Sequence, residues 1–179
     1  NCGSTSINDL PNLVKNNNSD FGLSMDGDGD RIVIVDKKGR VLDGDDILYT
    51  IIRGKILNNE EVKGVVGTIM TNLAFENFLK KEKIKFLRTN VGDKYVLEAM
   101  VKNGFTIGGE TSGHILLLDK LTSGDSIIAS LAFLYYSSIL KANGVNDLLK
   151  KFPQKITNIK INKSLPINIT NIAIKETLD

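Results

Sequence analysis

The sequence predicts an α/β fold in which βαβ crossovers join strands into mixed-sheet layers, with one complete domain and part of another. Between residues 64 and 118, short apolar runs typical of strands alternate with amphipathic stretches of about ten residues. The composition is 41% hydrophobic and 25% charged, which is ordinary for a folded protein and excludes wholesale disorder. A length of 179 residues suits one large domain or two small ones.

Residues 1–43 are expected to belong to a partial domain. Apolar residues from Ile7 to Val14 recur at helical spacing, and the polar run 16–19 ends that helix. Strands are predicted at 21–25, 32–36 and 41–42, with an acidic loop between the first two and a hairpin turn between the last two.

Residues 44–145 are expected to form the complete domain. The caps at 43–46 introduce the first helix of a series that we expect at 47–57, 72–83 and 94–103, and strands are expected at 65–71, 84–88, 105–108 and 114–118. A last helix, from Ile127 to about Lys141, is capped by Asp125. Because it is apolar nearly all round, we expect it to be buried. Residues 146–179 are interpreted as a linker and the start of a further domain, with extended, Ile-rich structure at 156–174.

Charge and composition exclude several classes of partner. The net charge is only +2 and four residues are Arg, which argues against a nucleic-acid reader. No apolar run has membrane-spanning length, and the opening residues lack the features of a signal peptide. The single cysteine, Cys2, cannot form an intramolecular disulfide, so a reduced cytoplasm is the expected location. Because the sequence does not begin with Met, we expect both termini to be cut edges of a longer protein.

An acidic loop follows the first predicted strand. Asp26, Asp28 and Asp30 alternate with Gly, so three carboxylates can turn inward on one tight loop. Three hard oxygen ligands suit a divalent cation, with Mg²⁺ as the first choice, and a solvent-exposed polar turn is the alternative. An EF-hand is disfavoured because its sixth position is Arg31, not Gly, and a haloacid-dehalogenase-like phosphatase ranks second. Arg31 is placed either to hold a phosphoryl group or to neutralise the loop.

A second polar loop lies between the strands predicted at 105–108 and 114–118. Glu110, Ser112 and His114, the only histidine, offer an acceptor, a hydroxyl and a titratable group to a polyol. Taken alone, this cluster is weak support for catalysis, because a single histidine beside strands is more often structural.

The two loops together support a more specific interpretation. D-G-D-G-D-R at 26–31 and G-E-T-S-G-H at 109–114 lie about eighty residues apart. The pair resembles the metal loop and the sugar-binding loop of the α-D-phosphohexomutase superfamily. N-C-G-S-T at 1–5, V-G-T-I-M-T-N at 66–72 and R-T-N-V-G-D-K-Y-V at 88–96 are similar to the bacterial phosphoglucosamine mutase branch. The resemblance covers nearly the whole chain.

The resemblance implies a fold of the phosphohexomutase type and a four-domain cytoplasmic parent enzyme. That enzyme would interconvert glucosamine 6-phosphate and glucosamine 1-phosphate through a 1,6-bisphosphate, with a phosphoserine as donor, for cell-envelope precursor synthesis. Residues 1–43 would be the C-terminal half of domain 2, residues 44–145 domain 3, and residues 146–179 the approach to a further domain. The remaining domains and a phosphorylated hexosamine or hexose would be the partners, with no role for nucleic acid or membrane.

The resemblance also implies a role for each site residue. Asp26, Asp28 and Asp30 would bind Mg²⁺, and Arg31 and His114 would assist the movement of charge and protons. The substrate hydroxyls would be contacted by the second loop through Gly109, Glu110 and Ser112.

Two loops of the family are missing from this sequence. Neither the phosphoserine loop, T-A-S-H-N-P in type, nor the phosphate-gripping R-x-S-G-T-E-P loop occurs in the 179 residues. The chain alone is therefore expected to be inactive. A phosphomannomutase or phosphoglucomutase of the same superfamily, and a non-catalytic module that binds a sugar phosphate or a metal, are the alternatives.

Overall fold

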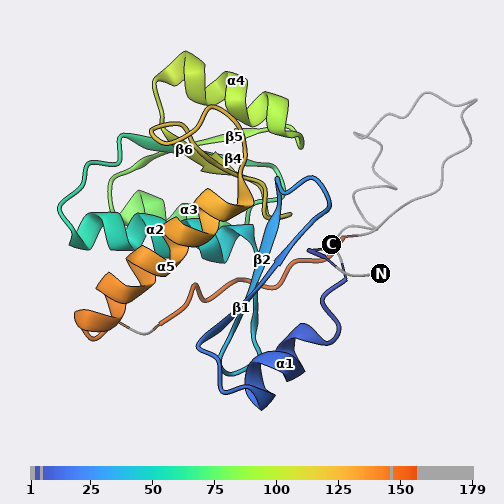
Figure 1. Cartoon of the computed structure of the whole chain (residues 1–179). Coiled ribbons are helices and arrows are strands. Elements are labelled where there is room, and N and C mark those ends of the chain that lie inside the picture. Colours follow the sequence, from blue (N-terminus) through green and yellow to red (C-terminus); the bar gives the residue numbers. More distant parts are fainter. Residues whose placement is uncertain (1–2, 5, 146, 157–179) are drawn as a thin grey trace, which may run out of the picture.

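The computed structural model describes residues 3–4, 6–145 and 147–156 (Figure 1). Two sheets and five helices account for the regular structure of these residues. In chain order the elements are α1 (Leu10–Asn16), β1 (Phe21–Met25), β2 (Ile32–Asp36), β3 (Val41–Leu42), α2 (Gly44–Leu57), β4 (Gly64–Thr68), α3 (Leu73–Lys81), β5 (Lys85–Thr89), α4 (Asp93–Asn103), β6 (Ile107–Gly109), β7 (Ile115–Leu117) and α5 (Ser126–Ala142).

The smaller sheet has the order β1-β2-β3 and is antiparallel throughout. All five residues of β2 are buried, as expected for a central strand that is covered on both faces. The turn between β2 and β3 is closed by Asp36, whose carboxylate accepts hydrogen bonds from the backbone amides of Lys38 and Arg40, both at 2.9 Å. This sheet places the acidic loop between β1 and β2.

The larger sheet has the order β5-β4-β6-β7. β4 runs parallel to both β5 and β6, whereas β7 is antiparallel to β6. α3 and α4 provide the crossovers between the parallel strands. The mixed sheet with βαβ connections that the sequence predicts is confirmed.

Helices cover both faces of the larger sheet (Figure 1). Alternation along β4 divides its side chains between the two layers: Val66 packs with Val96 and Met100 of α4, whereas Val65 faces the layer that contains Phe75 of α3 and Ile52 of α2. The result is an α/β/α arrangement with α4 alone on one side.

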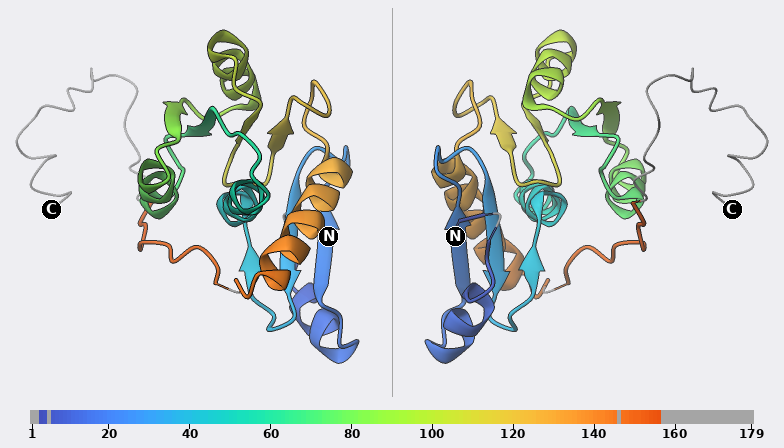
Figure 2. Two further views of the ribbon diagram at one scale, coloured as in Figure 1. Left: turned by 90° about the vertical axis from the view of Figure 1, so that its left-hand side faces the viewer. Right: turned by 90° about the vertical axis from the view of Figure 1, so that its right-hand side faces the viewer.

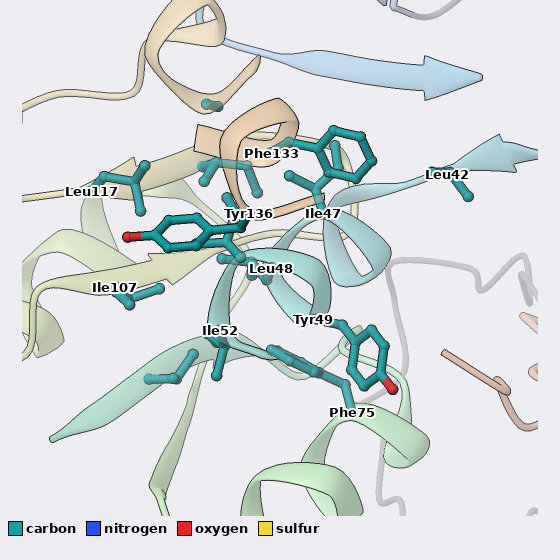
Figure 3. Close-up of a cluster of buried hydrophobic side chains, with 14 of the residues drawn as sticks. Leu42, Ile47, Leu48, Tyr49, Ile52, Phe75, Ile107, Leu117, Phe133 and Tyr136 are labelled. Atoms are coloured by element: carbon teal, nitrogen blue, oxygen red, sulfur yellow. The ribbon is translucent and has the colours of Figure 1, made fainter. Parts of the chain in front are cut away.

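α2 and α5 pack against each other and link the two sheets in one hydrophobic core. Figure 3 shows Leu42 from the smaller sheet, Ile107 and Leu117 from the larger sheet, and Phe133 of α5 in this cluster. The ring of Phe133 also meets Phe21 of β1 edge to face, with centroids 5.2 Å apart. The acidic loop and the second loop are therefore carried by sheets that share one core.

Two predictions about these elements are wrong. α5 is only partly buried: Ile127, Leu131 and Tyr135 form a stripe that is 59%, 61% and 54% exposed. The helix packs through its opposite side, so its apolar character all round does not show which side is covered. β4 ends at Thr68, not at residue 71. There Thr71 donates its amide to the carbonyl of Thr68 at 3.1 Å and turns the chain into α3.

The other predicted elements are present, with ends that differ by a few residues. The largest shifts are of three residues, and one of them is in α1, which begins at Leu10 instead of Ile7. β6 begins at Ile107, two residues later than expected, whereas α2 begins at Gly44 because Asp43 is the N-cap of a capping box with Asp46.

Residues 147–156 follow α5 without helix or strand and pass toward α3 (Figure 2). Lys151 forms ion pairs with Asp43 at 2.6 Å and Asp46 at 2.5 Å at the start of α2. Phe152 exchanges two hydrogen bonds with the side chain of Asn72, the N-cap of α3. The predicted Ile-rich segment beyond residue 156 lies outside the described residues. Among the described helices, none combines the length and the apolar character that a membrane-spanning segment needs.

Candidate functional site

The acidic loop joins β1 to β2 and is closed by its own backbone. The amide of Asp26 donates to the carbonyl of Arg31, and the amide of Gly29 donates to the carbonyl of Asp26, both at 3.3 Å. Gly29 has a φ of +73°, a conformation that glycine adopts without strain. Gly29 thus allows the tight turn that the sequence predicts.

The three aspartates of the loop gather their carboxylates. One oxygen from each of Asp26, Asp28 and Asp30 lies within 4.8 Å of the others. Asp28 is exposed, whereas Asp26 and Asp30 are half-buried. The Oδ2 atom of Asp26 is buried.

Arg31 neutralises part of this negative charge. Its Nε atom lies 2.8 Å from Asp26 Oδ2 and 3.4 Å from Asp30 Oδ1. Burial acts to raise the pKa of Asp26, but the hydrogen bond from the Arg31 amide and the nearby guanidinium outweigh it, so the pKa lies below its ordinary value. Asp26 is therefore ionised at neutral pH.

The carboxylate trio fits a small divalent cation. Octahedral Mg²⁺ with oxygen ligands at about 2.1 Å sets neighbouring oxygens roughly 3 Å apart and opposite ones roughly 4 Å apart. The 4.8 Å limit within which the three oxygens lie is slightly wider, so a small closure of the loop would suffice.

The second loop joins β6 to β7 and presents the other predicted residues. The amide of Glu110 donates to the carbonyl of His114 at 2.9 Å, and the Glu110 carboxylate accepts a 2.9 Å hydrogen bond from the amide of Gly92 at the start of α4. Ser112 is exposed at the tip of the loop. Gly109 is buried in β6, and a Cβ atom there would lie 2.6 Å from the carbonyl oxygen of His114.

The structure brings the two loops together. Arg31 and His114 form an isolated antiparallel bridge, and the amide of Ile32 donates to the carbonyl of Gly113 at 3.1 Å. Nδ1 of His114 lies 3.1 Å from Oδ2 of Asp30. The histidine, which is only 6% exposed, is thus held between the acidic loop and the larger sheet.

Gly124 and Asp45 are site residues that the motif analysis missed. Gly124 packs against His114, because a Cβ atom there would lie 2.5 Å from both Cε1 and Nε2 of the ring. Asp45 is 1% exposed and accepts hydrogen bonds from the amide of Asn72 at 2.8 Å and from the hydroxyl of Thr111 at 3.4 Å. Burial raises the pKa of Asp45 to about 6.

A repeated Gly-Asp pair could have pointed to these residues. Gly44-Asp45 lies at the start of α2, and Gly124-Asp125 directly precedes α5. Each of these two helices follows one of the two loop-bearing strand pairs in the chain. The pattern indicates two similar strand–loop–strand units, each followed by a helix.

This fold and these loops are those of a phosphosugar mutase domain. Residues 43–156 match the sequence profile of the phosphoglucomutase/phosphomannomutase family, alpha/beta/alpha domain III, and the chain belongs to this family. It is also similar to the phosphoglucosamine mutase of Hydrogenovibrio crunogenus, with 42% identity over 183 residues that cover 99% of this chain and 40% of that protein. The resemblance to phosphohexomutases is confirmed, and the chain spans about 40% of the length of this curated relative.

Solved structures of phosphosugar mutases share the fold. A phosphoglucomutase/phosphomannomutase family protein from Burkholderia thailandensis aligns with a TM-score of 0.66 and 20% identity, over 80% of this chain and 32% of that chain. The N-acetylphosphoglucosamine mutase of Aspergillus fumigatus, solved in complex with GlcNAc-6P and magnesium, aligns with a TM-score of 0.56 and 21% identity. That alignment covers 80% of this chain and 38% of the fungal chain.

Proposed function

We propose that this chain is part of an enzyme that interconverts glucosamine 6-phosphate and glucosamine 1-phosphate by phosphoryl transfer through a 1,6-bisphosphate. The observation that supports this proposal most directly is the 3.1 Å contact between Asp30 and His114. Through this contact the carboxylate trio lies beside the loop that contains Glu110 and Ser112. The named function of the 42% identical relative favours the glucosamine substrate. Residues 1–43 and 146–179 would belong to neighbouring domains, and the whole enzyme would act in the cytoplasm.

The second loop would bind the sugar. Glu110 has one carboxylate oxygen held by Gly92, so the carboxylate is oriented before a ligand arrives and its other oxygen can accept from a sugar hydroxyl. Ser112 is exposed beside it and can donate or accept. Buried Gly109 would contribute through its backbone, by keeping β6 close to His114.

His114 and Arg31 would serve the transfer itself. A carboxylate can only accept, so the contact with Asp30 calls for a proton on Nδ1 of His114 and leaves Nε2 as the nitrogen that exchanges a proton with the substrate. Arg31 has 41% of its side chain exposed while it pairs with Asp26, so it can also attract a phosphoryl group.

Mg²⁺ is the proposed ion for Asp26, Asp28 and Asp30. When bound, it would neutralise negative charge on the carboxylates and on a phosphoryl group, which is the main requirement of phosphoryl transfer. The spacing of the carboxylate oxygens supports this assignment.

Calorimetric titration of the 179-residue chain with MgCl₂ tests the metal site. Asp28→Asn removes one exposed ligand and should weaken binding at least about tenfold. Asp20→Asn makes the same change in net charge outside the trio and serves as the control, with affinity equal to that of the unaltered chain. Equal affinity in the two variants would remove Asp28 from the site.

The sugar assignment is tested on the complete protein that contains this chain. Coupled assays with glucosamine 6-phosphate, mannose 6-phosphate and glucose 6-phosphate should give the highest kcat/KM for glucosamine 6-phosphate. A preference for mannose or glucose would assign the enzyme to the phosphomannomutase or phosphoglucomutase activity instead. No turnover of any of the three would contradict the mutase proposal.

A further inference from the structure

Each of the two loops is hydrogen-bonded to the first residue of a helix that follows the other loop. Gly44 begins α2, which comes after the acidic loop, and its amide donates to the carbonyl of Thr111 in the second loop at 3.1 Å. Ser126 begins α5, which comes after the second loop, and its amide donates to the carbonyl of Gly29 in the acidic loop at 2.9 Å. The two connections are reciprocal.

First-turn amides are suited to this role, because the first N–H groups of a helix have no acceptor within the helix and carry the positive end of its dipole. Leu73 and Asp93 occupy the same position in α3 and α4, and their amides have no acceptor among the described residues. In α1 the amide of the first residue, Leu10, donates to the carbonyl of Ile7, only three positions away, at 3.0 Å. Among the described helices, the bond from the first amide to a loop distant in the chain is thus a property of α2 and α5, which flank the site.

The contacts are close on both sides. A Cβ atom on Gly44 would lie 1.9 Å from the carbonyl oxygen of Glu110, so α2 reaches the second loop only because this residue is glycine. Ser126 is 1% exposed, and its hydroxyl is buried with no partner among the described residues. The backbone amide of Ser126, and not its hydroxyl, therefore makes the connection to the acidic loop.

We propose that Gly44 and Ser126 are positioning residues, whose amides hold the second loop and the acidic loop at a set separation before any ligand binds. Together with the hydrogen bond from Ile32 to Gly113 at the centre, they attach the loop pair through three backbone hydrogen bonds, beside the side-chain contact between Asp30 and His114. The positioning itself follows from the fold, whereas its benefit to metal and sugar binding rests on the proposed function.

Amide hydrogen exchange in the unaltered 179-residue chain tests the positioning directly. After correction for intrinsic rates, the amides of Gly44 and Ser126 should exchange at least about tenfold more slowly than those of Leu73 and Asp93. Equal rates for all four amides would overturn the proposal. This measurement needs neither metal nor substrate, so it stands even if the proposed function fails.

A matched pair of variants tests the consequence for the acidic loop. Proline suits the first position of a helix, and Asp125 has the extended φ of −147° and ψ of 117° that a following proline requires. Ser126→Pro therefore keeps α5 but replaces the amide hydrogen with a ring carbon that pushes Gly29 away. Ser126→Ala keeps the amide and removes only the unpartnered hydroxyl.

Magnesium titration of the two variants should separate them. We expect Ser126→Pro to weaken Mg²⁺ binding about 10- to 100-fold, the range for loss of a group that orients metal ligands, and Ser126→Ala to stay within about twofold of the unaltered chain. Equal affinity in the two variants would overturn the role of the amide. If the unaltered chain binds no Mg²⁺, the proposed metal site fails and the exchange rates alone decide the positioning. The exchange rates of the unaltered chain also decide the positioning role if Ser126→Pro does not fold.

Discussion

Gly113→Ala tests how strongly the acidic loop and the second loop depend on their close approach. Gly113 has a φ of +93°, and a Cβ atom there would lie 2.0 Å from the carbonyl oxygen of Ile32. Ordinary van der Waals contact for such a pair begins at 3.4 Å, so the two backbones would have to separate by more than 1 Å. That separation breaks the 3.1 Å hydrogen bond from Ile32 to Gly113.

The expected loss of stability has two parts. Placing a residue with a side chain at positive φ costs about 1 to 2 kcal/mol. Leaving the buried amide and carbonyl unpaired costs a further 1 to 3 kcal/mol or so. The free energy of unfolding should therefore fall by about 2 to 5 kcal/mol, a large share of the roughly 5 to 15 kcal/mol that stabilises a typical domain.

Urea unfolding followed by circular dichroism measures this loss, with Gly104→Ala as the matched control. Gly104 also has positive φ, +65°, but a Cβ atom there has no neighbour within 4 Å. The free energy of unfolding of the control should fall only by the cost of placing a side chain at positive φ, about 1 kcal/mol. If the two variants are destabilised equally, the close approach of the loops contributes nothing to stability and the reasoning is wrong.

Three further perturbations probe other parts of the fold. The pKa of Asp45 is about 6 in the folded chain against 3.8 as the ordinary value, so its contribution to stability is present below pH 4 and is lost as the pH rises through 6. Relative to Asp45→Asn, the unaltered chain should lose about 2 kcal/mol of unfolding free energy between pH 4 and pH 7 in urea titrations, and parallel pH profiles would contradict this. Gly124→Ala should displace the ring of His114 from Asp30, which NMR can follow because the chain has one histidine; an unchanged Cε1–H resonance would refute the packing. Phe133→Ala should cost about 3 to 5 kcal/mol of unfolding free energy, and a loss below about 1 kcal/mol would exclude Phe133 from the core.

The order and type of the elements follow from local features of the sequence. The alternation of β4, β5 and β6 with helices is encoded in the spacing of apolar residues, and the caps Asp43, Asn72 and Asp125 mark three helix starts. The gathering of Asp26, Asp28 and Asp30 was also predictable, because the glycines between them allow three nearby carboxylates to turn inward on one tight loop. The exposed stripe on α5 was not, since a helix that is apolar all round does not indicate which side faces the core.

The sequence by itself determined which chemical groups are present and on which kind of loop they lie. Only the tertiary structure decided that Asp30 meets His114 and that Ser126 bonds to Gly29, since these partners are 84 and 97 positions apart in the chain. Such contacts depend on how two sheets pack against α2 and α5, and no local periodicity encodes that packing. The site therefore exists because a shared core brings two separately encoded loops within hydrogen-bonding distance.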